Sequence, residues 1–220
     1  METTIAGERL QLLPQKAIFW PSKSILFLAD LHLGKVNHFR RAGIPVPTRA
    51  NDRNLELIVD LVNLTRPDRL ICLGDLFHSH YNPEWEAFGE LIRHFRSTSF
   101  ELVMGNHDIM SDQQYKRKGI VVHEHLLVDP FLLTHHPLDG DETARAKSLP
   151  AGYNLAGHLH PGVTMRGAGR QSVTLPCFYF GRQSGLLPAF GTFTGLARIK
   201  PRKEDKIYVI ADEKIIAVES

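Results

Sequence analysis

Residues 25–32 read ILFLADLH, an apolar run that ends abruptly at Asp30 and His32. The same pattern returns at RLICLGD (69–75) and at ELVMGNHD (101–108). A short apolar run bounded by polar or turn residues is typical of a buried strand. Three such strands, each followed directly by imidazole, carboxylate or amide side chains, indicate a parallel sheet with functional groups at its carboxyl edge.

Helical patterns separate these three strands. One apolar stripe with helical spacing consists of Leu55, Ile58, Val59 and Val62. Pro83 can open a second helix at its first turn, with Trp85 on the buried side. Alternating strands and helices favour parallel strands that are covered by helices.

The second half of the chain has a different pattern. After Gly157 it becomes rich in glycine and in short apolar runs, over 163–175, 177–190 and 207–218, which are typical of antiparallel hairpins. We therefore predict an α/β fold of two packed mixed β-sheets flanked by helices, the first sheet mainly parallel and the second partly antiparallel. Because no linker interrupts the chain, we expect a single domain over residues 1–220.

Composition narrows the class of protein. The 220 residues are 43% apolar, and 26 basic residues nearly balance 24 acidic ones, which excludes an intrinsically disordered chain. No apolar run approaches the roughly 18 residues of a membrane span, so we expect a cytoplasmic protein without a membrane partner. Cys72 and Cys177 are too few for a disulfide framework or a thiolate metal cluster, and we interpret them as buried thiols.

Two further motifs, HHP (135–137) and GHLH (157–160), also follow apolar runs. Taken singly, such motifs occur on surfaces and in turns, but five in order at strand ends favour a metal site. Imidazole, carboxylate and amide ligands suit manganese, iron or zinc, and there are enough of them for two ions that share one carboxylate. In an extended segment residues i and i+2 point the same way, so Asp30 with His32, and likewise the two histidines of GHLH, can aim at one place. The glycines before Asp75, Asn106 and His158 leave room for close backbone approach.

These motifs resemble the signature of the calcineurin-like dinuclear metallophosphoesterases, whose expected fold is an α/β/β/α sandwich. Four less specific segments are similar to the bacterial ligase-associated DNA-damage-response endonucleases. These segments are HFRRAGIPVP (38–47), GDLFHS (74–79), LPCF (175–178) and LPAFGTFTG (187–195). The resemblance implies that one ion is held by Asp30, His32 and His160. It implies that the other is held by Asn106, His135 and His158, with Asp75 as the bridge.

The same resemblance implies roles for two neighbouring residues. His107 stays unligated and faces the substrate, and Asp108 is the partner that fixes its tautomer. The doublet His135-His136 leaves an ambiguity, because either imidazole can be the ligand. We favour His135, since the family pattern places the ligand first at the end of the strand.

The implied activity is hydrolysis of DNA phosphodiester bonds by two-metal activation of a bridging hydroxide, as by a repair endonuclease. The implied cofactors are two divalent ions, with manganese favoured over iron or zinc, and the implied partners are single-stranded or damaged DNA and a repair ligase or helicase. Two basic segments, 35–53 and 198–206, are candidate nucleic-acid surfaces. The candidate substrate contacts are Arg40, Arg41 and His78. Alternatives are a phosphoesterase of cyclic nucleotides, nucleotides or phosphoproteins, and a non-catalytic scaffold of the same fold.

Overall fold

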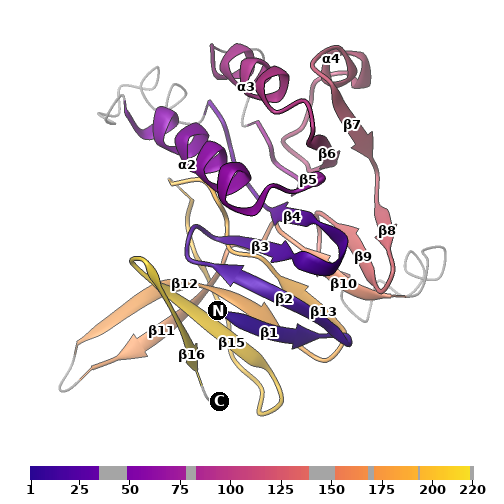
Figure 1. Ribbon diagram of the computed structural model, residues 1–220. Coiled ribbons are helices and arrows are strands. Elements are labelled where there is room, and N and C mark those ends of the chain that lie inside the picture. The colour runs from indigo at the N-terminus through magenta and orange to yellow at the C-terminus, as the bar shows by residue number, and fades with distance from the viewer. Residues whose placement is uncertain (35–48, 78–82, 139–151, 168–170, 193, 219–220) are drawn as a thin grey trace.

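A computed structural model of the chain describes residues 1–34, 49–77, 83–138, 152–167, 171–192 and 194–218, with only the backbone for 49–52 and 83. Two mixed sheets lie against each other (Figure 1). The first sheet has seven strands in chain order, β1 (Glu2–Ile5), β2 (Glu8–Leu13), β3 (Ala17–Trp20), β4 (Ile25–Leu28), β5 (Arg69–Leu73), β6 (Ser99–Val103) and β7 (Ile120–His123). The predicted α/β fold class is confirmed.

The strands of the first sheet divide into two halves. From β4 to β7 all neighbours are parallel, as the three apolar runs predict. From β1 to β4 all neighbours are antiparallel, so the prediction of a mainly parallel first sheet is wrong for residues 2–20. The β1–β2 turn accounts for the first of these pairs, because Ala6 and Gly7 both have positive φ, which suits a two-residue hairpin.

The second sheet has nine strands, β8 (Leu126–Val128), β9 (Phe131–Thr134), β10 (Tyr153–Ala156), β11 (Pro161–Arg166), β12 (Ser172–Phe180), β13 (Ser184–Leu186), β14 (Ala197–Arg198), β15 (Lys206–Ala211) and β16 (Lys214–Val218). Strands β9, β10 and β13 are parallel. The β11–β12, β12–β13 and β15–β16 pairs are antiparallel, which confirms the predicted hairpins.

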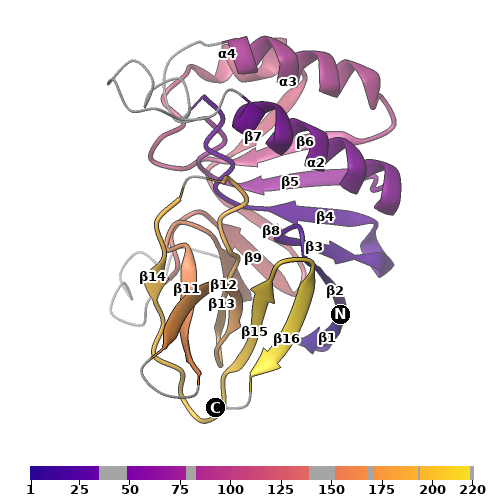
Figure 2. The same ribbon diagram turned by 90° about the vertical axis from the view of Figure 1, so that its left-hand side faces the viewer.

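The described α-helices are α2 (Arg49–Thr65), α3 (Pro83–His94) and α4 (Asp112–Arg117), and a short 3₁₀ helix η1 spans Pro21–Lys23. All three α-helices lie on the outer side of the first sheet, away from the second sheet (Figure 2). α2 carries the predicted apolar stripe, and α3 begins at Pro83 as predicted. Within the described ranges, no helix is both long and apolar enough to cross a membrane.

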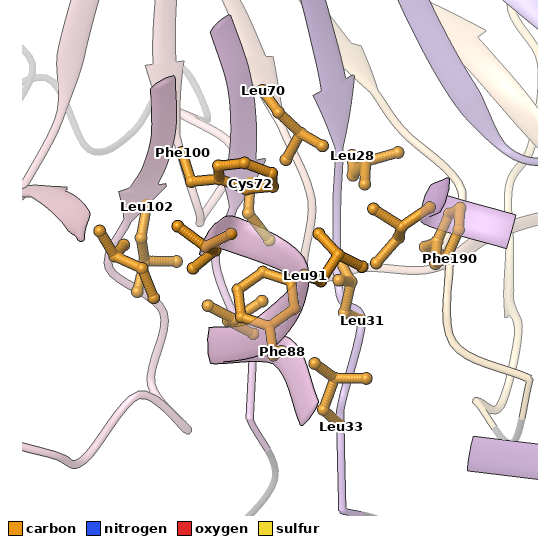
Figure 3. Close-up of a cluster of buried hydrophobic side chains, with 14 of the residues drawn as sticks. Leu28, Leu31, Leu33, Leu70, Cys72, Phe88, Leu91, Phe100, Leu102 and Phe190 are labelled. Carbon is orange, nitrogen blue, oxygen red and sulfur yellow. The ribbon is translucent and has the colours of Figure 1, made fainter. Parts of the chain in front are cut away.

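Both faces of the parallel strands β4, β5 and β6 are buried, which explains why their sequences are largely apolar. On β4, Leu26 and Leu28 belong to the core beneath the helices, whereas Ile25 and Phe27 belong to the core between the sheets. The close-up in Figure 3 shows the first of these cores, where Phe88 and Leu91 of α3 gather with side chains of the sheet. The two cores fix both sheets and hence the edge at which their strands end.

A buried ion-pair network joins β5, β6 and β7. Glu101 is 7% exposed, accepts hydrogen bonds of 2.6 and 2.9 Å from the Arg69 guanidinium, and lies 2.8 Å from Nε2 of His123. Burial by itself raises the pKa of the Glu101 carboxyl, but the hydrogen bonds and positive charges of Arg69 and His123 outweigh burial and lower that pKa. Glu101 therefore favours its ionised form in the folded protein.

We expect Glu101→Gln to lower the free energy of unfolding at pH 7 by about 3 kcal/mol, because the substitution leaves Arg69 without its charged partner. The native pKa of Glu101 lies below its unfolded value of about 4.3. Its stabilisation is thus complete above that value and is lost as pH falls through the native pKa. Urea titrations at pH 7 and pH 3 measure both effects. The control Glu90→Gln removes the exposed pair with Arg93, and an equally small change in both variants would contradict a stabilising network.

Candidate metal centre

The predicted ligands lie where five parallel strands end. Asp30 and His32 follow β4, Asp75 follows β5, and Asn106 follows β6 in the first sheet. In the second sheet His135 follows β9, and His158 and His160 follow β10. The structure thus brings all seven predicted ligands to one edge, where several of them contact one another across the two sheets.

One group consists of Asp30, His32 and His160, whose ligand atoms all lie within 4.8 Å of one another. Nε2 of His160 is 3.5 Å from Oδ1 of Asp30. On the other side of the ring, Nδ1 of His160 lies 3.2 Å from the Gly195 carbonyl oxygen and donates to it. This hydrogen bond leaves Nε2 as the basic nitrogen that faces the group, which is the usual orientation of a metal-binding imidazole.

A second group surrounds His135. Its Nε2 lies 3.1 Å from Oδ1 of Asn106 and 3.1 Å from Nδ1 of His158, while its Nδ1 donates to the Leu73 carbonyl at 3.0 Å. His135, His136 and His158 also have ligand atoms within 4.8 Å of one another. Of the doublet, His135 is 2% exposed and donates to the Leu73 carbonyl, whereas His136 is exposed. The ring centroids of His136 and His158 are 4.1 Å apart. Both imidazoles are therefore at the site, and the preference for His135 stays a prediction.

Asp75 lies between the two groups. Its Oδ1 is 3.5 Å from Nε2 of His135, and its Oδ2 is 3.7 Å from Nε2 of His32. The ligand atoms of Asp30, Asp75 and His135 also lie within 4.8 Å of one another. Each oxygen of Asp75 thus faces a different group, which is a geometry that suits a bridging carboxylate.

His107 and Asp108 follow Asn106 directly but face different surroundings. The backbone N–H of His107 donates to Oδ1 of Asp75 at 2.9 Å, and its side chain is 41% exposed with Nε2 4.0 Å from Oδ2 of Asp75. Asp108 is buried, and its carboxylate accepts hydrogen bonds from the backbone N–H groups of Leu76 and Gly105, both at 2.9 Å. Burial raises the pKa of Asp108 to about 6. Asp108 therefore ties two loops of the site together, and its predicted action on the His107 ring stays a prediction.

The backbone at the site adopts a conformation that most residues avoid. Five of the seven predicted ligands have φ between +47° and +66°, namely Asp30, His32, Asp75, His158 and His160. Positive φ costs free energy in residues with a Cβ and is concentrated at functional sites. Asp30 and His32 do converge in one group, whereas His158 and His160 belong to different groups. The expected extended geometry is wrong, because all four residues have left-handed backbone conformations.

Two glycines allow the loops to approach. A Cβ on Gly74 would lie 2.1 Å from Nδ1 of His135, and a Cβ on Gly105 would lie 2.4 Å from both the backbone N and Oδ1 of Asp75. Gly74 also has φ of +81°, which favours glycine. These contacts confirm that the glycines before Asp75 and Asn106 make room for the site.

The donor set fits divalent metal ions. Asp30 and Asp75 are 0% and 3% exposed, and within the described ranges every ion-pair partner of these two carboxylates is an imidazole. Buried carboxylates need compensating positive charge, which neutral imidazoles do not supply. Carboxylate, imidazole and amide donors together suit divalent transition metals.

The remaining candidates are the three predicted substrate contacts and the buried cysteine of β5. Arg40, Arg41 and His78, the predicted substrate contacts, lie outside the described residues. Cys72 is buried, and burial raises the pKa of its thiol well above the ordinary value. Cys72 is thus a poor nucleophile, as its place in the apolar run of β5 predicts.

Comparison with known proteins identifies the family. Residues 23–131, which include Asp30, His32, Asp75 and Asn106, match the sequence model of the calcineurin-like phosphoesterases. The chain belongs to this family. The calcineurin-like phosphoesterases are hydrolases that act on phosphoester bonds and use divalent metal ions.

One solved structure is similar along the whole chain. The nuclease MPE of Pseudomonas putida is 27% identical, with 99% of both chains covered and a TM-score of 0.82. The phosphoesterase YfcE of E. coli is 17% identical, covering 88% of this chain and 96% of its own, with a TM-score of 0.45. An archaeal phosphodiesterase is 15% identical, covering 88% and 98%, with a TM-score of 0.41. No curated protein matches this calcineurin-like phosphoesterase.

We expect Gly105→Ala to lower the free energy of unfolding by about 2 kcal/mol and to weaken metal binding, because the new methyl group displaces Asp75. Unfolding monitored with and without Mn²⁺ measures both effects. Gly167→Ala is the matched control, since its Cβ would meet only the Gln171 side chain, at 3.9 Å, and Gly167 contacts none of the predicted ligands. If both variants were equally stable and bound Mn²⁺ equally, the loop would not depend on the close approach of Gly105.

Proposed function

We propose that this protein is a metal-dependent phosphodiesterase that cuts DNA internally, as an endonuclease of DNA repair. The observation that carries the proposal is Asp75, whose two oxygens face two separate groups of ligands. A similar protein over the full length, from Pseudomonas putida, is a nuclease. Together these findings support a phosphodiester of nucleic acid as the substrate.

In this proposal each group of ligands holds one ion. Asp30, His32 and His160 would hold the first, and the second would be held by Asn106, His135 and His158. Asp75 would contact both ions. When bound, a pair of divalent ions supplies Lewis acidity and a hydrolytic nucleophile near neutral pH.

The protein itself contributes charge balance and geometry. Asp30 and Asp75 return only two negative charges against the four positive charges of two divalent ions, so the pocket keeps a positive charge that attracts a phosphodiester anion. Two imidazoles are held by hydrogen bonds from Nδ1 to backbone carbonyls, His135 to Leu73 and His160 to Gly195. These hydrogen bonds keep Nε2 of each ring directed toward the site. Because bound divalent ions would supply the nucleophile, the proposed reaction requires no nucleophilic side chain.

His107 is the candidate general acid. Its side chain is partly exposed, and Nε2 lies 4.0 Å from Oδ2 of Asp75, at the rim of the candidate metal centre. An imidazole at that position can contact a phosphate oxygen or protonate the departing oxygen of the diester. Its backbone N–H bond to Asp75 keeps it next to the bridging carboxylate.

We propose manganese as the ion, single-stranded or damaged DNA as the substrate, and residues 1–220 as a single domain. A ligase or helicase is the proposed protein partner, on the ground of the sequence resemblance alone. Arg40, Arg41 and His78 stay candidates for the DNA contact.

The direct test is cutting of circular single-stranded DNA with Mn²⁺, because circles have no ends and only an endonuclease opens them. We expect the wild type to linearise circles and Asp75→Asn to be slower by at least about 100-fold, since both ions lose a ligand. The control is Asp60→Asn on the exposed side of α2, which should cut like the wild type. Rapid hydrolysis of a chromogenic monoester with intact circles would instead favour a small phosphoester as the substrate.

We expect His107→Ala to bind Mn²⁺ like the wild type and to lose about 100-fold or more in turnover of diesters with poor leaving groups. Diesters with good leaving groups should lose much less, because their departing oxygen needs no proton. Steady-state rates over a series of leaving groups measure this difference. The exposed His125 provides the control His125→Ala, and a leaving-group dependence unchanged by His107→Ala would remove His107 from proton transfer.

A further inference from the structure

An open groove of about 720 Å³ lies beside the candidate metal centre on the second sheet. Its walls include Pro137, Leu159, Arg182, Arg202, Lys203 and Asp205. They come from four separate segments, after β9, after β10, in the β12–β13 turn and before β15. The fold, not the local sequence, therefore assembles this groove.

The groove begins at the metal ligands. Pro137 follows His136 directly, and Leu159 lies between His158 and His160. Leu159 is exposed although it is a large apolar residue. A polymeric substrate with one phosphodiester at the metal centre must cross the surface on either side of it, and this groove offers a path on the side of His136 and His158.

The groove carries basic side chains from two places. Arg202 and Lys203 belong to the basic segment 198–206, and Arg182 is added from the β12–β13 turn. Both arginines are exposed. Their planar guanidinium groups match the geometry of phosphate oxygens.

The two acidic residues of the groove offset part of the charge of its three basic groups, which leaves a net charge of 3 − 2 = +1. The carboxylate of Asp205 already accepts hydrogen bonds from the Tyr179 hydroxyl at 3.0 Å and from the Arg202 backbone N–H at 2.7 Å. Asp205 thus shapes the wall that carries Arg202. Glu204 is the other acidic group of the lining, against the three basic groups.

We propose that a single strand of DNA leaves the metal centre along this groove, with Arg182 and Arg202 contacting its backbone phosphates and Leu159 and Pro137 contacting a base. This inference rests on the proposed nuclease function and extends it by naming the binding surface. A positive groove that follows the backbone, with apolar side chains for the bases, is the general design of single-strand binding.

The test compares wild type with Arg182→Ala plus Arg202→Ala. Anisotropy of a labelled single-stranded oligonucleotide gives the affinity at several salt concentrations, and a chromogenic diester reports the metal centre independently. Each phosphate contact contributes about 0.7 to the slope of log affinity against log salt, so two lost contacts should reduce the slope by about 1.4. At 0.1 M salt this corresponds to an affinity about 25-fold lower. Hydrolysis of the small diester should not change.

Two controls make the test specific. Lys23→Ala plus Arg96→Ala removes the same charge from exposed positions before β4 and β6, at the opposite edge of the first sheet, and should leave the slope unchanged. Arg182→Lys plus Arg202→Lys keeps the charges and should keep most of the slope. If the alanine pair bound and cut DNA with the wild-type slope, the groove assignment would be wrong while the nuclease function stood. If the wild type hydrolysed the small diester but neither bound nor cut DNA, the proposed function would fail and this inference with it.

Discussion

Two carboxylates buried side by side impose the strongest constraint on this molecule. Asp30 and Asp75 lie at the centre of the site, almost without exposure to solvent, and buried charges are costly unless other groups compensate them. The protein provides part of that compensation through backbone donors. The N–H of His158 donates to Asp30, and the N–H of His107 donates to Asp75. In the proposed function divalent ions provide the rest.

The fold holds the site by continuing its hydrogen bonding beyond the strands. The N–H of Asp30 donates to the Gly74 carbonyl and the N–H of His32 to the Asp75 carbonyl, so the loops after β4 and β5 stay paired. The N–H of Gly191 donates to the Asp30 carbonyl and adds a third segment to the same edge. The core between the sheets then sets the distance from this edge to the ligands of β9 and β10. The left-handed residues and glycines are thus consequences of crowding several loops around two carboxylates.

Much of this arrangement could be predicted from the sequence, because each apolar run marks a strand and each motif marks its end. The antiparallel strands of residues 2–20 escaped prediction, since they are short and mix polar with apolar residues, although Gly7 marks their first turn. The left-handed conformation of Asp30 and His32 also escaped, because local patterns do not report how closely loops pack. Arg182 was missed for a related reason, as only the tertiary structure brings the β12–β13 turn to the groove.

In the proposed function Asp75 and the six ligands around it hold two ions at the same time. The most direct measurement is anomalous diffraction from crystals soaked in manganese. The account predicts two peaks about 3.5–4 Å apart, with Asp75 between them. A single peak, or none near these residues, would contradict it.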